Sequence, residues 1–366
     1  ILYTAFTQFL GFYNYGDEYK VVGLSPYGKA KYVNKVREVL QVSSNGFFER
    51  KRDYCSHCSE GGSMSGAGGS PTIGKLFTNK FETLFGKART KRDELTQYHM
   101  DLAASVQKLT EEVIFTLAED LYKKTGSKNL CLAGGVAQNS VANGKLLANT
   151  SFENLFVPPA GHDAGTSVGS ALFFIHNMKG LKRPEFKKQA YTGACFTDEF
   201  IEDYLKGKEI NYERLSESEL YDRVSEKLLD AGVIGWFQGR AEFGPRALGN
   251  RSILVDPRRS DAKELLNSKI KRRESFRPFA PSILKEYTEE YFEFSDDVPF
   301  MEKVYKIRPE KHSAIPAVTH VDGTGRLQTV EKVDNERYHN LSSAVNEKSG
   351  APSGGKTAVK ENEPSV

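Results

Sequence analysis

The sequence predicts an α/β protein of two domains, for three reasons. The chain of 366 residues is long enough to bury two hydrophobic cores. Short apolar runs alternate with helical patterns over residues 129–176 and again over residues 220–284, which is typical of α/β sheets. Residues 177–190 are basic, contain a proline and show no apolar period, so we interpret them as a linker. The predicted domains are therefore residues 1–176 and 191–338.

The first predicted domain contains alternating strand and helix patterns in its second half. From Leu102 to Gly126 the apolar positions recur every three or four residues, which predicts an amphipathic helix. Two short apolar runs, each followed by Gly or Pro, predict strands. The expected elements are a helix over 102–126, a strand over 129–133, a helix over 138–147, a strand over 155–157 and a helix over 164–176.

The second predicted domain repeats this alternation. Its expected elements are a helix over 220–229, a strand over 233–237, a strand over 252–255, a helix over 261–270 and a strand over 282–284. Two other segments lack the apolar residues of a core. Residues 59–70 are rich in Gly and Ser and predict a flexible loop. Residues 339–366 are polar and predict a disordered tail.

The composition is that of a soluble globular protein, with 39% hydrophobic and 27% charged residues. The net charge of +3 is too small by itself to indicate binding to nucleic acid or to a membrane surface. No run approaches the roughly 18 apolar residues of a membrane span, and the first residues do not resemble a secretory signal. We therefore expect a cytoplasmic protein that binds neither nucleic acid nor a membrane.

The cysteines agree with that location. Cys55 and Cys58 form a Cys-x-x-Cys pair with His57 between them, and Cys131 and Cys195 are isolated in sequence. A structural zinc site needs a second ligand pair at a matching spacing, which does not follow. We favour reduced thiols in a mobile loop over a zinc site.

Two glycine turns follow the predicted strands of the first domain. Gly134 and Gly135 lie between a strand and a helix, where exposed N–H groups and the absence of Cβ atoms suit a phosphate or a nucleotide. Glycines in such a turn are equally consistent with backbone geometry alone. In the second turn Asp163 can bind a metal or cap the next helix, and His162 is expected at the surface. Because both turns follow carboxyl ends of strands, we expect them to line one cleft.

The densest basic motif lies in the second domain. Arg240, Arg246 and Arg251 fall within residues 238–252, among three glycines and a proline and directly after an apolar strand. Guanidinium groups bind phosphate through paired hydrogen bonds. A second basic stretch, residues 269–281, is framed by aromatic residues and prolines. An open basic patch for nucleic acid lacks such framing, so we favour a pocket for a phosphate-bearing small molecule.

A third polar motif places His320, Asp322 and Arg326 around two glycines. The histidine can act as an acid or a base, or it can orient a substrate. It can equally be a turn residue whose hydrogen bonds are satisfied, and the sequence alone leaves these alternatives open.

Together these motifs resemble the carbamoyltransferases of antibiotic and nodulation-factor biosynthesis. The resemblance runs in order from about Leu2 to Tyr338 and is far more specific than any single motif. The segments that carry it are residues 20–28 (KVVGLSPYG), 101–107 (DLAASVQ), 130–136 (LCLAGGV), 141–147 (VANGKLL), 243–252 (FGPRALGNRS), 271–281 and 320–330.

The resemblance implies an actin-like, ribonuclease-H-like domain joined to a domain similar to the YrdC/Sua5 fold. It also implies an ATP-dependent reaction. The second domain would hydrolyse carbamoyl phosphate to carbamate and adenylate the carbamate with ATP. The first domain would then transfer the carbamoyl group from carbamoyl-adenylate to the hydroxyl group of a small-molecule acceptor.

The resemblance also implies roles for individual residues. Gly134, Gly135 and Asn139 would hold the adenosine part of the nucleotide, and Asp163 would bind a divalent metal, iron or magnesium. The phosphates would be gathered by Arg246, Arg251, Lys271, Arg273 and Arg277, together with Arg240 and Arg326. Within the second domain, Arg246, Arg251, Lys271 and His320 are the expected catalytic residues.

The chain departs from the family pattern at both ends. It does not begin with methionine, and the family's His-x-x-x-His metal pair precedes the position of Ile1, so we expect a truncated N-terminus. After Ser349 and Gly350 the family continues into an apolar strand and an Asn-Thr-Ser-Phe-Asn stretch, so we expect an altered C-terminus.

Two other classes of function are possible. A non-catalytic nucleotide-binding module of the actin-like superfamily would not need the second, arginine-rich phosphate site. A threonylcarbamoyl-type tRNA-modifying enzyme would need a broad basic face, which the net charge of +3 does not favour.

Overall fold

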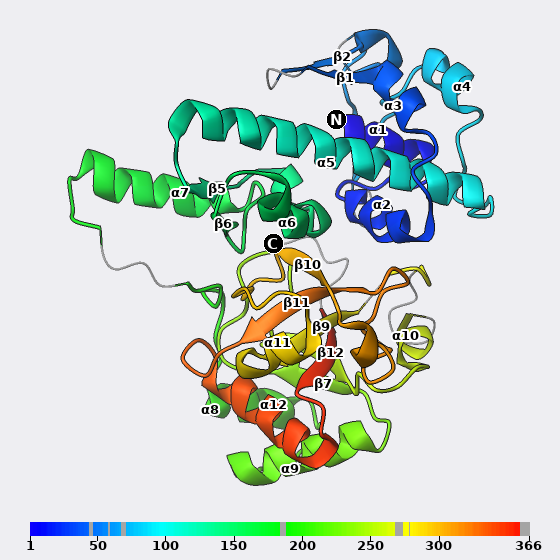
Figure 1. Cartoon of the computed structure of the whole chain (residues 1–366). Helices are drawn as coiled ribbons and strands as arrows, with labels where there is room; N and C mark the ends of the chain where they lie inside the picture. Colours follow the sequence, from blue (N-terminus) through cyan, green and yellow to red (C-terminus); the bar gives the residue numbers. More distant parts are fainter. Residues whose placement is uncertain are drawn as a thin grey trace.

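The computed structural model describes residues 1–43, 47–57, 59–66, 71–183, 188–267, 274–277 and 279–358. We call residues 1–183 the first region and residues 188–358 the second region (Figure 1). Both regions mix helices and strands, so the predicted α/β class is confirmed. The actin-like and YrdC-like arrangements stay predictions. Among the described helices, none is long and apolar enough to cross a membrane.

A long helix, α5 (Gln97–Thr125), organises the first region. It begins earlier than predicted because Thr96 and His99 form a capping box, and it ends where Gly126 adopts a left-handed φ of 63°. The helices that contact it are α1 (Leu2–Phe9), α2 (Glu18–Leu24), α3 (Val33–Val39) and α6 (Ser140–Leu146).

The core beside α5 is aromatic. The ring of Phe6 in α1 lies 4.8 Å from Phe81 and 5.1 Å from Phe85, both in α4 (Asn79–Phe85), measured between ring centroids. Edge-to-face pairs of this kind stabilise a core beyond the area that they bury. Two small hairpins complete this part, β1 (Leu40–Val42) with β2 (Phe48–Arg50) and β3 (Met64–Ser65) with β4 (Thr72–Ile73).

The predicted strand–helix alternation follows α5. The strands β5 (Asn129–Cys131) and β6 (Asn154–Phe156) pair in parallel, with α6 between them in sequence. The helix α7 (Gly165–Phe173) comes after β6 and continues as a π-helical turn over Phe174–Met178. No residue of α7 or of this turn is buried, and α7 projects from the side of the first region (Figure 1).

A six-stranded sheet forms the centre of the second region, in the order β10-β11-β9-β12-β8-β7. The pair β9–β11 is parallel, and the other neighbouring strands are antiparallel. The strands are β7 (Ile234–Phe237), β8 (Arg251–Val255), β9 (Ala280–Leu284), β10 (Lys303–Lys306), β11 (Thr324–Val330) and β12 (Ser353–Ala358).

Helices α9 (Glu217–Leu229) and α12 (Glu336–Ser349) pack on each other and on strands of this sheet. Their apolar side chains bury Trp236 and Leu254 on one face. On the other face Ile283 and Leu327 belong to a second core, so the sheet is covered on both sides. The remaining helices are α8 (Asp198–Gly207), α10 (Ala262–Leu265) and α11 (Thr288–Tyr291), with short 3-10 turns at Ser25–Tyr27, Arg52–Tyr54, Gly135–Gln138, Leu147–Asn149, Lys285–Tyr287 and Pro309–Lys311.

The prediction of a disordered tail over residues 339–366 is wrong as far as residue 358. Helix α12 buries Tyr338, Leu341 and Val345, a spacing of three and four residues that polar neighbours hide in the sequence. Strand β12 lies between β8 and β9, and its backbone groups are satisfied on both sides in spite of its glycines. Residues 359–366 lie outside the described part.

The other differences are smaller. Strands β10 and β11 were not predicted, because their sequences lack a clear apolar period. The predicted helix over 261–270 is helical at Ala262–Leu265, and residues 268–270 lie outside the described part. The same holds for Cys58, residues 67–70 and residues 184–187, on which the predictions of the thiol pair, the flexible loop and the linker partly rest.

Candidate active site

The two predicted glycine turns meet at one edge of the β5–β6 pair. The Gly134 N–H donates to the Gly161 carbonyl at 2.6 Å, so the turn after β5 is joined to the turn after β6. Gly134 has a φ of 102°, which favours glycine. A Cβ atom at Gly134 or Gly135 would have no heavy atom of the described chain within 4 Å, apart from neighbours in sequence. The two turns therefore lie together, and the first turn is open on its outer side. That they line one cleft stays a prediction.

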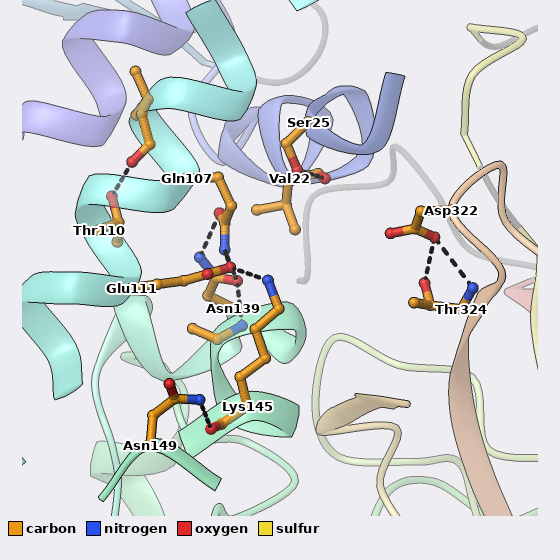
Figure 2. Close-up of polar contacts among 12 residues, drawn as sticks. Val22, Ser25, Gln107, Thr110, Glu111, Asn139, Lys145, Asn149, Asp322 and Thr324 are labelled. Atoms are coloured by element: carbon orange, nitrogen blue, oxygen red, sulfur yellow. Dashed lines mark hydrogen bonds and ion pairs between the residues drawn. The ribbon is translucent and has the colours of Figure 1, made fainter. Parts of the chain in front are cut away.

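Asn139 fixes this turn from inside. Its side-chain oxygen accepts the Ala142 N–H at 3.2 Å and caps α6. Its amide also exchanges hydrogen bonds with the amide of Gln107 in α5, at 2.9 and 3.1 Å (Figure 2). All of these contacts are buried, so the side chain that was expected to hold adenosine connects the turn to α5. Its role in binding a nucleotide stays a prediction.

A buried polar network extends from this pair. Gln107 donates to the Glu111 carboxylate at 3.0 Å, and the Lys145 ammonium reaches the same carboxylate at 2.8 Å (Figure 2). The Tyr3 hydroxyl donates to the oxygen of Gln107 at 3.0 Å and adds α1 to the network. Sequence reasoning missed these residues as site residues. The available signal was two polar side chains, Gln107 and Glu111, four residues apart on the buried face of a helix.

The arginine-rich loop of the second region reaches the turns of the first. Arg246 Nη2 donates to the Gln138 carbonyl at 3.1 Å, directly after the Gly134–Gly135 turn. Gly244 has a φ of 142°, and a Cβ there would lie 2.5 Å from the Pro159 carbonyl oxygen. A residue other than glycine would therefore separate the two regions at this point. The structure thus brings Arg246 to the predicted nucleotide turn.

Arg251 and Arg240 hold the same loop in place. The guanidinium of Arg251 donates to the Gln238, Gly239, Asn250 and Ala194 carbonyls at 2.6–3.2 Å. It also stacks on Phe237 at 3.6 Å from the ring centroid, and Arg240 donates to the Gly193 carbonyl at 3.2 Å. These contacts shape the loop, and the roles of both arginines toward phosphate stay predictions.

Glu242 is a loop residue that sequence reasoning missed. Its Oε1 accepts the Leu248, Asn250 and Arg251 N–H groups at 2.8, 2.8 and 3.2 Å. Three hydrogen bonds to one carboxylate oxygen therefore fix the conformation of the loop. The only signal in the sequence was a carboxylate within a glycine- and arginine-rich segment.

His320 lies buried in the second region. Its backbone N–H donates to the Thr324 carbonyl at 2.8 Å, and its ring Nδ1 lies 3.3 Å from the Thr324 hydroxyl. That hydroxyl donates to Asp322 at 2.7 Å (Figure 2). Ring Nε2 is buried and has no hydrogen-bond partner among the described residues. Burial lowers the pKa of His320 to about 4, although Asp322 acts in the opposite direction, so the ring is neutral at pH 7.

The remaining predicted site residues of the second region lie in different places. The Arg277 guanidinium stacks over Tyr19 of the first region at 4.5 Å from the ring centroid, and its Nη1 lies 3.8 Å from Glu274. Arg326 lies in β11 and is considered below. Lys271 and Arg273 lie outside the described residues, so their predicted roles are not tested.

Asp163 lies exposed at the start of α7, and its backbone carbonyl accepts both the N–H and the hydroxyl of Thr166. His162 is half-buried rather than fully at the surface, and its Nδ1 is buried without a hydrogen-bond partner in the described ranges. Within those ranges no three His, Cys, Asp or Glu side chains cluster as metal ligands. The described donor set therefore does not fit a catalytic metal by itself.

Comparisons with known proteins agree with this geometry. The chain matches the family model described as "Carbamoyltransferase N-terminus" over residues 1–172 and the one described as "Carbamoyltransferase C-terminus" over residues 225–365. These matches place it in a class of transferases. The chain belongs to the carbamoyltransferase family. The second match extends through most of the segment that was expected to have diverged.

Three curated relatives illustrate the likeness. An uncharacterised protein of Synechocystis sp. is 40% identical over 370 residues, covering 93% of this chain and 58% of the relative. The nodulation protein NolNO of Sinorhizobium fredii is 39% identical over 96% of this chain and 49% of the relative. A 3'-hydroxymethylcephem-O-carbamoyltransferase of Amycolatopsis lactamdurans is 33% identical over 64% of this chain and 43% of the relative. The chain thus spans about half the length of the curated relatives it matches.

Proposed function

We propose that the chain takes part in ATP-dependent O-carbamoyl transfer from carbamoyl phosphate to the hydroxyl group of a small-molecule acceptor. The observation that carries the proposal is the hydrogen bond from Arg246 to the Gln138 carbonyl, beside the open Gly134–Gly135 turn. It brings a phosphate-binding type of side chain to a nucleotide-binding type of turn. The relative named as an O-carbamoyltransferase supports the same reaction class.

The proposed chemistry has three steps. Water cleaves carbamoyl phosphate to carbamate and inorganic phosphate. A carbamate oxygen then attacks the α-phosphorus of ATP, so that a new P–O bond forms and pyrophosphate leaves. Finally the acceptor oxygen attacks the carbamoyl carbon, AMP leaves with the electrons of the broken C–O bond, and the hydroxyl proton passes to solvent.

The residues of this chain contribute charge and position. The cationic Arg246 would stabilise negative charge on the phosphoryl oxygens as pyrophosphate departs. The neutral His320 can accept a proton or a hydrogen bond at Nε2, and its low pKa keeps it unprotonated at pH 7. No step is assigned to a metal, because the described ligands do not fit one. Among the described residues the thiols of Cys131 and Cys195 are free, which is in keeping with a proposed cytoplasmic location.

The test is carbamoyl phosphate-dependent release of pyrophosphate from ATP by the purified chain. Arg246→Ala is expected to reduce this rate about 10²- to 10³-fold, as removal of one preorganised electrostatic group does. It is expected to leave ATP binding by the first region within about twofold of the wild type. Arg214→Ala is the matched control, because that side chain is 70% exposed and, within the described ranges, its ion pair is with Glu202 at 3.5 Å. Equal loss of both properties in Arg246→Ala would refute this division of roles.

A further inference from the structure

Two lysines in the six-stranded sheet are buried in very different ways. Lys303 in β10 is 4% exposed, and its ammonium lies 2.8 Å from the Asp296 carboxylate. Lys356 in β12 is 1% exposed, yet its Nζ has no hydrogen-bond partner within the part of the chain that the structure describes. A buried ammonium without a partner is strongly unfavourable, so a protein that retains one usually uses it. Lys356 therefore requires an explanation that Lys303 does not.

The sheet register places Lys356 beside a second cation. Lys356 lies opposite Ala280 in the β12–β9 pair, and side chains opposite each other share one face. In the β9–β11 pair Ser282 lies opposite Gln328, so Arg326, two residues before Gln328, is level with Ala280 on that same face. Lys356 and Arg326 thus flank the small side chain of Ala280, two strands or roughly 10 Å apart at the backbone.

The arginine-rich loop 239–251 covers this pair. The Lys356 ammonium lies 5.1 Å from the centroid of the Tyr338 ring. The same ring contacts the loop, because a Cβ at Gly249 would lie 2.5 Å from a Tyr338 ring atom. Lys356 is therefore separated by a single aromatic side chain from the loop that carries Arg240 and Arg246.

Two charged side chains, Glu242 and Arg326, act on the buried amine of Lys356. Glu242 is the carboxylate that acts on it, and one oxygen of Glu242 already accepts three backbone N–H groups of the loop. Arg326 adds a like charge. Burial lowers the pKa of Lys356 well below the usual lysine value, Glu242 partly opposes that effect, and Arg326 adds to it. The buried amine of Lys356 thus lies near a second basic side chain and near a carboxylate oxygen whose hydrogen bonds go to the loop backbone.

We propose that Lys356 is a further anion-binding residue of this protein, which together with Arg326 binds phosphate oxygens of a phosphorylated substrate beneath the 239–251 loop. The proposal rests on the proposed function for the identity of that substrate. A phosphate brings the negative charge and the hydrogen-bond acceptors that the amine lacks in the protein alone. Because the loop covers the amine, the loop has to open before the anion enters.

The test compares Lys356→Met with Lys303→Met in thermal unfolding, with and without inorganic pyrophosphate as the probe. A ligand that binds the folded state raises Tm. We expect Lys356→Met to be at least as stable as the wild type without pyrophosphate, since it removes an unpartnered buried amine. Its affinity for pyrophosphate is expected to fall about ten- to a hundredfold, the usual effect of losing one charge-assisted hydrogen bond.

Lys303→Met is expected to show the reverse. It leaves the partly exposed Asp296 carboxylate without its ammonium and lowers Tm, but it keeps the rise in Tm with pyrophosphate. Lys356→Gln is the second variant, in case the methionine variant does not fold. An undiminished rise in Tm in a folded Lys356 variant would overturn the proposal, as would the absence of any rise in the wild type. Failure of both Lys356 variants to fold would also overturn it, because the amine would then be structural.

This test is separate from that of the proposed function. A Lys356-dependent rise in Tm, in a chain that releases no pyrophosphate from ATP, supports the anion site and rejects the reaction. Release of pyrophosphate at the same rate by wild type and Lys356→Met supports the reaction and rejects the role of Lys356.

Discussion

The sheets of the two regions differ in how they are covered. The six strands of the second region have a buried core on each face. The parallel pair β5–β6 has a small core of Ala118, Leu130, Leu146 and Phe152 on the side of α5 and α6. Beyond it α7 and its π-helical turn bury no residue, and Phe173 and Met178 are 59% and 67% exposed.

This difference shows which of the two sheets is stabilised by burial on both faces. Parallel strands are normally covered on both faces, so a bare pair gains little free energy from burial. The second region can hold a charged loop because its own core stabilises it. The turns after β5 and β6 are instead fixed from three sides, by the Gln107–Asn139 pair, by the bond between the turns and by the arginine-rich loop.

The largest expected effect compares one leucine from each region. Leu327→Ala removes a fully buried side chain from the second region and should cost about 2–5 kcal/mol of unfolding free energy. Leu172→Ala in α7, where the leucine is 49% exposed, should change it by no more than about 0.5 kcal/mol. Urea unfolding of both variants measures the difference. Similar costs at both positions would show that α7 is covered in solution.

The second effect is the dependence of stability on pH that His320 causes in the second region. The pKa of His320 is lowered to about 4 in the folded protein, so the unfolded chain takes up this proton first as the pH falls. This residue should therefore destabilise the fold by roughly 2–3 kcal/mol as the pH falls from about 6.5 to 4. Burial raises the pKa of Glu302 to about 7, which has the opposite effect on stability over much of this range.

The readout is therefore the difference between wild type and His320→Gln. The free energy of unfolding of His320→Gln, relative to that of the wild type, should rise as the pH falls. The pH-dependent part of this difference should vanish above pH ~7. Denaturant unfolding between pH 4 and 7 measures it, and a difference that does not change with pH would contradict a buried, neutral His320.

The third effect concerns the polar network that supports the glycine turn of the first region. Gln107→Leu removes the hydrogen-bond partner of the Asn139 amide nitrogen and one of the two partners of the Glu111 carboxylate, which keeps Lys145. It should cost about 1–3 kcal/mol. If the turn holds ATP, the dissociation constant for ATP should also rise. Gln41→Leu is the matched control, because Gln41 is exposed on β1. If Gln107→Leu loses stability but binds ATP as tightly as the wild type, the network does not support nucleotide binding at the turn.

The sequence predicts strands best where apolar runs end in Gly or Pro. The runs around Leu130 and Leu155 gave parallel strands, and their carboxyl ends placed Gly134 and Asp163 at one edge. It failed at β12, whose strand conformation depends on pairing with β8 and β9 rather than on its own residues. Because β12 was not predicted as a strand, Lys356 was not recognised as a buried residue.

Single side chains were harder to place than motifs. Asn139 was expected to face a nucleotide, but it faces Gln107, which lies 32 residues earlier in the chain. The roles of Gln107 and Glu242 depend on contacts that only the folded chain creates. Arg251 belongs to a basic motif, yet four carbonyl groups that surround it in the fold take up its hydrogen bonds.

The most direct test of the account is the release of pyrophosphate from ATP in the presence and absence of carbamoyl phosphate, in wild type and Arg246→Ala. The account predicts release only when carbamoyl phosphate is present, and a rate about 10²- to 10³-fold lower in the variant. Release that does not depend on carbamoyl phosphate, or an unchanged rate in Arg246→Ala, would contradict the proposal. The reaction site would then not lie where the arginine-rich loop meets the glycine turn.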